Sequence, residues 1–456
     1  MKRRILSLWC LLAAAVMLGG CSATNVITSV DALLRPPRLT DDQNDIYDAL
    51  AAYLSGREMH LVYPQQGDYL SAFIQQDLDG DQLDEAVVFY QLTASTSAAP
   101  INMAVMDRQS GRWTVVSDIQ LDGSGVEDFT VVHGEGKPMM AVGLSYAGES
   151  GSSLLQVFRL YGKELRLVFS RTYLAKTIGD LTGDGKNEFL LVYPHESSEG
   201  VQSVQAGLFV CADGDDENEG FVQAVSCPVN PEITRYQQLN TVISVQDSRD
   251  TRVHVYLDGY RGNAMLTEEI LLVTKNGVSE LENLTWSDAG DWTGESYPQR
   301  FMLNAMDING DGWYEIPGQQ PLPGYETEDT EIVYLTTWYR HFGRRYIPLY
   351  SAYINSLLSY QFIFPDEWNG NVTAYRGPYG NEITFSVWDE DKPMEDTALM
   401  SLRAVNIASW RSGKVSPEYE YLGSRGQIVF LARIIDTTSR YAVSMEDIRE
   451  RFMDMG

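Results

Sequence analysis

The stretch "DINGDGWYEI", residues 307–316, places oxygen-bearing side chains at alternate positions and then runs into apolar residues. Two further copies of this pattern occur, "DLDGDQLDEAVVFY" from Asp77 and "DLTGDGKNEFLLVY" from Asp180. Oxygen ligands fall at positions 1, 3, 5 and 9 of the copies: Asp77, Asp79, Asp81 and Glu85; Asp180, Thr182, Asp184 and Glu188; Asp307, Asn309, Asp311 and Glu315. Ca²⁺ prefers about six to eight oxygens, and a tight turn whose alternate side chains point inward supplies several of them. We therefore predict up to three structural calcium sites.

The rest of each calcium shell would come from water and from the backbone carbonyl at position 7, which is Leu83, Lys186 or Trp313. Gly185 and Gly312 at position 6 allow the positive φ that such a turn needs. An EF-hand would instead require a glutamate at position 12, followed by a helix. Position 12 is Val88, Leu191 or Gly318, and a strand pattern follows the first two copies, so we disfavour a helical calcium motif.

Residues 58–357 consist of short β-branched and aromatic runs separated by Gly, Asp and Asn clusters, which indicates a mainly β fold. A worn copy of the loop, "QLDGSGVEDFTVV", begins at Gln120, and the polar turn "QDSRD" near residue 247 falls where another copy would lie. Each interval between copies holds about four strands, and four strands per unit around a central axis make a propeller blade. We predict a β-propeller of about five four-stranded blades over residues 58–357.

These loops resemble the FG-GAP repeats of integrin alpha-subunit β-propellers and the related bacterial repeats known as VCBS. The resemblance covers roughly residues 65–350 and rests on the three loop copies quoted above. It implies that each loop joins two strands of a blade and holds structural calcium on one face of the propeller. The chain departs from the family pattern at Gln82, which replaces a loop glycine, and at Thr182, which is a weaker ligand. The Phe-Gly and Gly-Ala-Pro signatures of the family are also missing.

Two segments flank the predicted propeller. Residues 40–57 read as a capping helix, because Thr40 and Gln43 form a capping box and Gly56 supplies a stop. Residues 358–456 mix strand patterns with a closing helix capped by Ser444, which predicts a small α+β domain. This domain is rich in aromatic residues that either pack in its core or form a platform for sugar or peptide: Trp368, Tyr375, Tyr379, Trp388 and Trp410.

The amino terminus predicts export and a lipid anchor. Residues 1–20 combine a basic start with an apolar run, as in a signal peptide, and the ending Leu-Gly-Gly-Cys resembles a bacterial lipobox. That resemblance implies cleavage before Cys21 and attachment of diacylglycerol to its sulfur, followed by a linker over residues 21–39. No other segment has the ~20 apolar residues needed to cross a bilayer. The lipid on Cys21 is therefore the predicted membrane attachment.

Charge and motif content exclude several classes of function. Loss of Lys2, Arg3 and Arg4 with the signal would change the net charge from −29 to −32, which disfavours nucleic-acid binding. The basic cluster of Arg340, His341, Arg344 and Arg345 reads as a solvated strand and turn or as an anion contact. Cys211 and Cys227 are either two buried thiols or a disulfide. The five histidines fit no zinc motif, and we identify no catalytic residue.

The sequence therefore predicts a lipid-anchored, extracytoplasmic, calcium-binding β-propeller that binds a protein, peptide or glycan at the cell envelope. Two alternatives remain open at this stage. One is an envelope hydrolase that acts on a glycan or phosphoester with carboxylates in the propeller funnel. The other is a structural subunit of a surface complex.

Overall fold

The computed structural model describes residues 39–455, apart from 94–99, 135, 147–150, 199, 213–219, 248–249, 263, 286–302, 327–330, 343–344 and 378–379. The predicted signal peptide, Cys21, most of the linker and Tyr379 lie outside the described residues. In the described part of the chain, no helix is long and apolar enough to span a membrane.

The described chain begins with α3 (Asp41–Tyr53), and Thr40 and Gln43 form the expected capping box. Ile46, Leu50 and Leu54 are fully buried against the first sheet. Tyr53, at the end of the helix, is instead 51% exposed. The helix thus covers one face of the first sheet through residues spaced four apart, which share one side of a helix.

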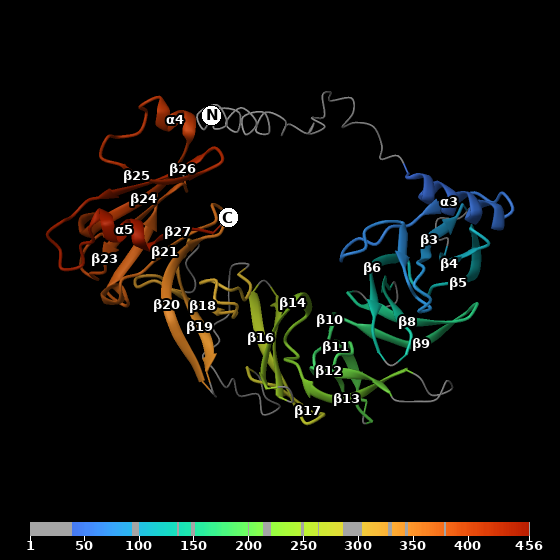
Figure 1. The fold of residues 1–456 in the computed structure, drawn as a ribbon. Helices are drawn as coiled ribbons and strands as arrows, with labels where there is room; N and C mark the ends of the chain where they lie inside the picture. Colours follow the sequence, from blue (N-terminus) through green and yellow to red (C-terminus); the bar gives the residue numbers. More distant parts are fainter. Residues whose placement is uncertain are drawn as a thin grey trace, which may run out of the picture.

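Six antiparallel sheets follow (Figure 1), and the mainly β prediction is confirmed. In the first five sheets, neighbouring strands of the sheet are nearly always neighbours in the sequence. The first sheet contains β1 (Met59–Leu61), β2 (Phe73–Gln76), β3 (Glu85–Leu92), β4 (Ile101–Gln109) and β5 (Arg112–Gln120). The second contains β6 (Gly125–Val132), β7 (Met139–Ser145), β8 (Ser153–Tyr161) and β9 (Glu164–Tyr173). The third contains β10 (Ala175–Gly179), β11 (Glu188–Glu196), β12 (Gln202–Ala212) and β13 (Gly220–Pro228).

The fourth sheet contains β14 (Arg235–Asp247), β15 (Asp250–Arg261), β16 (Ala264–Lys275) and β17 (Val278–Asn283). The fifth contains β18 (Ile316–Pro321), β19 (Tyr334–Phe342), β20 (Arg345–Asn355), β21 (Tyr360–Ile363) and β27 (Phe452–Asp454). The sixth contains β22 (Val372–Arg376), β23 (Glu382–Val387), β24 (Ala398–Asn406), β25 (Glu420–Arg425) and β26 (Ile428–Ile434). Short helices accompany the last sheet: η1 (Asp366–Trp368), η2 (Met394–Thr397), α4 (Ile407–Arg411) and α5 (Met445–Arg451).

The boundary expected at residue 358 cuts through the fifth sheet. β21 pairs with β20, and β27 near the carboxyl end pairs with β21. The α+β unit at the end of the chain is therefore joined to the fifth sheet by strand pairing. Within it, Trp368 is almost fully buried in the core, and Trp410 packs against a second small cluster.

Neighbouring sheets share hydrophobic cores. Alternate residues of a strand face opposite sides of its sheet, so Val87 and Phe89 of β3 face the second sheet while Val88 and Tyr90 face α3. Similar cores join the second sheet to the third, the third to the fourth, and the fifth to the sixth. Burying each such side chain contributes about 1.5–3 kcal/mol. This shared burial holds the series of sheets together.

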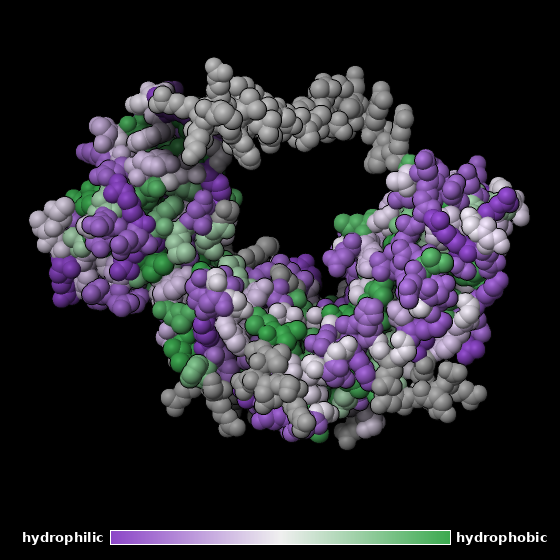
Figure 2. All heavy atoms as spheres, in the orientation of Figure 1, coloured by the Kyte–Doolittle hydropathy of each residue, from purple (hydrophilic) through white to green (hydrophobic). Residues whose placement is uncertain are grey.

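The sheets form an open arc (Figure 1). The first sheet is covered by α3, while the outer face of the sixth carries the cluster around Tyr419 and Leu431. No hydrophobic cluster of the described residues joins the first sheet to the sixth. The space-filling view shows the same arc, with hydrophilic residues over much of the surface near α3 (Figure 2).

Two sequence predictions about turns have different outcomes. The turn near residue 247 joins β14 to β15, the same place in its sheet at which the acidic loops from Asp77 and Asp180 join strands. The prediction of a further loop copy at Gln120 was wrong, because Gln120 ends β5 and Gly125 begins β6. Residues 121–124 thus connect the first sheet to the second; Asp122 lies in this connection, while Glu127 and Asp128 lie within β6.

No disulfide joins Cys211 and Cys227. They lie on the paired strands β12 and β13, where Cys211 is opposite Phe221 and Cys227 is opposite Ala206. This register keeps the two cysteines several residue pairs apart, which favours two thiols over a disulfide, although only Cys227 is buried.

Candidate metal centres

Three acidic loops share one hydrogen-bonded turn: the first loop (residues 77–85), the second (180–188) and the third (307–315). In the first, Asp77 accepts the backbone N–H groups of Gly80 at 2.7 Å and Gln82 at 3.0 Å. Asp180 and Asp307 accept the equivalent N–H groups in the second and third loops. The position-1 aspartate therefore closes each turn through backbone groups close to it in the chain. This is why the sequence alone could indicate the turn.

Positions 4 and 6 of every loop have positive φ. Glycine occupies position 4 in all three loops. This shared glycine is a further sequence signal for the turn, which our prediction did not use. Position 6 is Gly185 (φ +85°) and Gly312 (φ +86°) in the last two loops, as expected. In the first loop Gln82 adopts φ +72°. That backbone is costly for a residue with a Cβ, so the first loop carries strain at Gln82.

The position-9 glutamate lies under each loop. Glu85 Oε2 accepts the N–H of Leu78 at 2.7 Å and of Asp79 at 3.2 Å, and Glu188 makes the same two contacts in its loop. Both side chains are almost fully buried at the start of a strand. Burial raises the pKa of Glu85 to about 7, and neighbouring aspartates add to the shift. Burial likewise raises the pKa of Glu188 to about 7.

The first and second loops each gather three carboxylates that suit a hard cation. Oxygens of Asp77, Asp79 and Glu85 lie within 4.8 Å of one another, and so do those of the second set, Asp180, Asp184 and Glu188. These donors are all oxygens, the ligands that Ca²⁺ prefers. A cation would also offset the cost of ionising the two glutamates, since burial disfavours their charged form. Residues 77–85 and 180–188 therefore fit a divalent cation.

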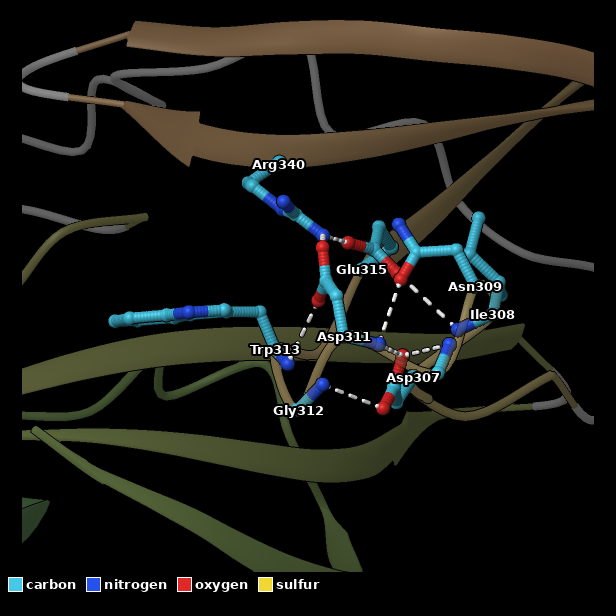
Figure 3. A network of polar contacts seen from close by, with 9 residues as sticks. Asp307, Ile308, Asn309, Asp311, Gly312, Trp313, Glu315 and Arg340 are labelled. Atoms are coloured by element: carbon cyan, nitrogen blue, oxygen red, sulfur yellow. Dashed lines mark hydrogen bonds and ion pairs between the residues drawn. The ribbon is translucent and has the colours of Figure 1, made fainter.

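The third loop satisfies its acids in another way (Figure 3). Arg340 of β19 lies 2.8 Å from Asp311 and forms a short ion pair with Glu315, whose side chain is fully buried. Desolvation opposes the charge on Asp311, yet hydrogen bonds from Trp313 and Arg340 hold the pKa of Asp311 below its usual range. The pairing with these two acids raises the pKa of Arg340. The guanidinium thus supplies the positive charge that a metal ion would bring.

The prediction for the basic cluster was wrong at Arg340, its first member, while Arg344 and the side chain of Arg345 lie outside the described residues. We expected Arg340 in a solvated strand or an anion contact, but it is an internal partner of loop carboxylates. Twenty-five residues separate Arg340 from Glu315, and only the pairing of β18 with β19 brings them together. Nothing in the local sequence pattern of either segment could have indicated this contact.

Ionisable groups also gather where the fourth sheet meets the fifth. The apolar core here is small, with Tyr256, Ala305 and Ile316 as its fully buried members. Beside it, the buried carboxylate of Glu269 lies 2.7 Å from His254 Nδ1 and accepts a hydrogen bond from the Tyr346 hydroxyl at 3.0 Å. Burial raises the pKa of Tyr346 well above its usual range, and Glu269 adds to the shift. No local sequence pattern indicates this polar junction, because Tyr346 comes from β20, a strand far along the chain from β15 and β16.

No protein-family model matches the chain, and no curated protein matches it. Among solved structures, an exotype rhamnogalacturonan lyase is 11% identical, with 72% of this chain and 73% of the lyase covered and a TM-score of 0.26. An endo-arabinase from Bacteroides thetaiotaomicron is 12% identical, with coverage of 65% and 98% and a TM-score of 0.20. An exo-beta-1,3-galactanase from Clostridium thermocellum is 8% identical, with coverage of 82% and 86% and a TM-score of 0.21. All three likenesses are distant.

Proposed function

We propose that this protein is a lipid-anchored, calcium-binding β-propeller of FG-GAP or VCBS type that binds a protein, peptide or glycan at the cell envelope. The first five sheets would be its blades, arranged in the open arc of Figure 1, and the sixth an appended α+β unit. The observation that carries the proposal is the pair of matching carboxylate clusters at equivalent turns of the first and third sheets. Such a cluster is poorly stable without a cation, and millimolar calcium outside the cytoplasm would supply one.

The proposal assigns one calcium ion to the first loop and one to the second. Calcium would bind Asp77, Asp79, Asp81 and Glu85 in one loop and Asp180, Thr182, Asp184 and Glu188 in the other. In the third loop, Arg340 takes the role of the ion beside Asp311 and Glu315. We therefore expect two ions, fewer than the three that the sequence allows.

Thermal melting of the purified chain tests the calcium assignment. A site with a Kd of ~10⁻⁴ M adds about 1.4 kcal/mol at ~1 mM calcium, so melting should rise by several degrees between excess EDTA and calcium. Magnesium should do much less, because it demands stricter octahedral geometry. Equal melting in EDTA, calcium and magnesium would refute the assignment, and calorimetric titration should count two ions.

Fractionation tests the anchor. Cys21→Ser should move the protein from the membrane fraction to the soluble fraction, because it removes the sulfur that would carry the lipid. Cys10→Ser is the matched control, since Cys10 lies inside the apolar run of the signal. Membrane retention of Cys21→Ser equal to that of Cys10→Ser would contradict the lipid anchor.

A further inference from the structure

A cavity of about 400 Å³ opens at the junction of the fourth and fifth sheets. Its volume falls within the ~300–1,000 Å³ range of small-molecule sites. Strands β15 and β19 and the third acidic loop contribute most of its wall: Arg252, His254, Trp313, Arg340, His341 and Phe342. The cavity thus lies where two sheets share little apolar core, beside the charged groups described above.

The wall of this cavity is unlike the rest of the protein in charge. The chain has 63 acidic and 34 basic residues. Among the described residues that line the cavity there are two arginines and two histidines, and no aspartate or glutamate. Guanidinium groups bind carboxylates through strong, charge-assisted hydrogen bonds. Because Arg340 already pairs with Asp311 and Glu315, and His254 with Glu269, we assign the contact with an anionic group of a ligand to Arg252.

His254 adds a ring nitrogen to the polar groups of the wall. Its Nδ1 lies 2.7 Å from Oε1 of the fully buried Glu269, and this contact orients the ring. Nε2 is therefore the ring nitrogen that can bond to a ligand. A hydroxyl group suits this position, because a hydroxyl both donates and accepts hydrogen bonds.

Aromatic rings complete the wall. Trp313 meets His254 edge to face, with ring centroids 5.0 Å apart, and Phe342 at the rim is 74% exposed. Trp313 projects from the third loop on the side away from Ile308 and Asn309 (Figure 3), and its backbone N–H donates to Asp311 at 3.0 Å. Because Asp311 also holds Arg340, the third loop positions both an aromatic and a cationic part of the wall.

We propose that this cavity binds an acidic sugar, a uronate unit of a glycan. Arg252 would bind its carboxylate, His254 Nε2 would form a hydrogen bond with a hydroxyl, and Trp313 and Phe342 would pack against the apolar face of the sugar ring. This inference rests on the proposed role as an envelope binding protein and names its ligand class as glycan. It also gives the third loop a task in place of calcium binding, which is to hold Arg340 and Trp313 at the cavity.

Tryptophan fluorescence of the full chain during titration with digalacturonate tests the proposal. A saturable change is expected, and Trp313→Phe should abolish it while calorimetry still detects binding. Arg252→Gln should weaken binding about tenfold or more, because one charge-assisted bond is lost. Arg166→Gln is the matched control, since Arg166 lies on β9 of the second sheet, outside the cavity wall, and should bind like the wild type. Neutral digalactose should bind at least about tenfold more weakly than digalacturonate.

Three outcomes would overturn the proposal: no saturable binding up to about 10 mM digalacturonate, unchanged affinity in Arg252→Gln, or equal affinity for inorganic phosphate. Each variant is also melted in EDTA and in calcium, which reports folding and the calcium sites independently. A retained calcium shift without digalacturonate binding would refute the uronate site alone. Binding of digalacturonate without any calcium shift would refute the calcium assignment and leave the uronate site standing.

Discussion

The second and third acidic loops have the same turn but neutralise their carboxylates differently. In both, the position-1 aspartate accepts the N–H groups of positions 4 and 6, and the position-9 glutamate lies buried beneath the turn. The second loop leaves three carboxylates close together, while Arg340 enters the third. An arginine from a neighbouring strand offsets the carboxylates of the third loop, and a metal ion would do the same in the second. The same local motif can therefore form a candidate calcium site, as in the second loop, or hold Arg340 and Trp313 in the wall of a cavity, as in the third.

Removal of the arginine should have the largest effect. Arg340→Met leaves the fully buried Glu315 without its partner, which we expect to cost about 3 kcal/mol in EDTA. Calcium should then restore more stability than it adds to the wild type, because the third loop becomes open to an ion. Arg166→Met is a control, since Arg166 and its partner Glu164 are both well exposed. If Arg340→Met melts like the wild type in EDTA, the internal-cation interpretation is wrong.

Aspartate-to-alanine variants should separate the two loops. Asp184→Ala should lose about 1.4 kcal/mol of calcium-induced stability at ~1 mM calcium and change little in EDTA. Asp311→Ala should lower the melting temperature by a similar amount in both buffers, because Asp311 binds Arg340 in either case. Thermal melts of both variants in EDTA and calcium make the comparison. Equal calcium dependence in the two variants would remove the distinction between the loops.

Proton competition should weaken the calcium sites at low pH. The pKa of Glu85 and that of Glu188 are raised from 4.5 to about 7 in the folded chain. Without metal, these groups therefore favour folding at low pH, and this contribution is lost as pH rises through about 7. Calcium requires the ionised form, so its affinity should fall up to about tenfold per site from pH 8 to pH 6. At ~1 mM calcium this removes about 1 kcal/mol per site.

Calorimetric titration with calcium at several pH values measures this effect. Glu188→Gln provides the control, because an amide cannot exchange a proton in this range, and it should lose the pH dependence at its own loop. Calcium affinity that stays constant from pH 6 to pH 8 would contradict proton competition at the buried glutamates.

The smallest effect concerns the first loop. Gln82→Gly should stabilise the protein by roughly 0.5 kcal/mol, because glycine relieves the positive φ but loses more entropy on folding. Gly185→Gln is the converse change in the second loop and should destabilise by about 1 kcal/mol, since its Cβ would meet nothing within 4 Å and only the backbone is strained. Urea denaturation of both variants measures the pair. A loss of stability in Gln82→Gly would show that the glutamine side chain itself supports the loop.

Sequence reasoning succeeded where the causes of structure lie close together in the chain. The capping box of α3, the strand patterns and the turn of all three acidic loops depend on contacts within about nine residues. It failed where segments far apart meet. The worn copy at Gln120 has an acidic pattern yet connects two sheets, and β27 joins a sheet whose other strands end about ninety residues earlier.

The sequence by itself determined the chemistry of the acidic loops, because each aspartate bonds backbone groups only a few residues away. It also determined the mainly β character, since alternation along a strand reflects its two faces. Only the tertiary structure decided which loop keeps its carboxylates available for an ion. Arg340 reaches Glu315 because β18 and β19 pair, and Trp313 reaches His254 because the fourth and fifth sheets are neighbours. Such contacts depend on the register and order of strands, which no local pattern of residues records.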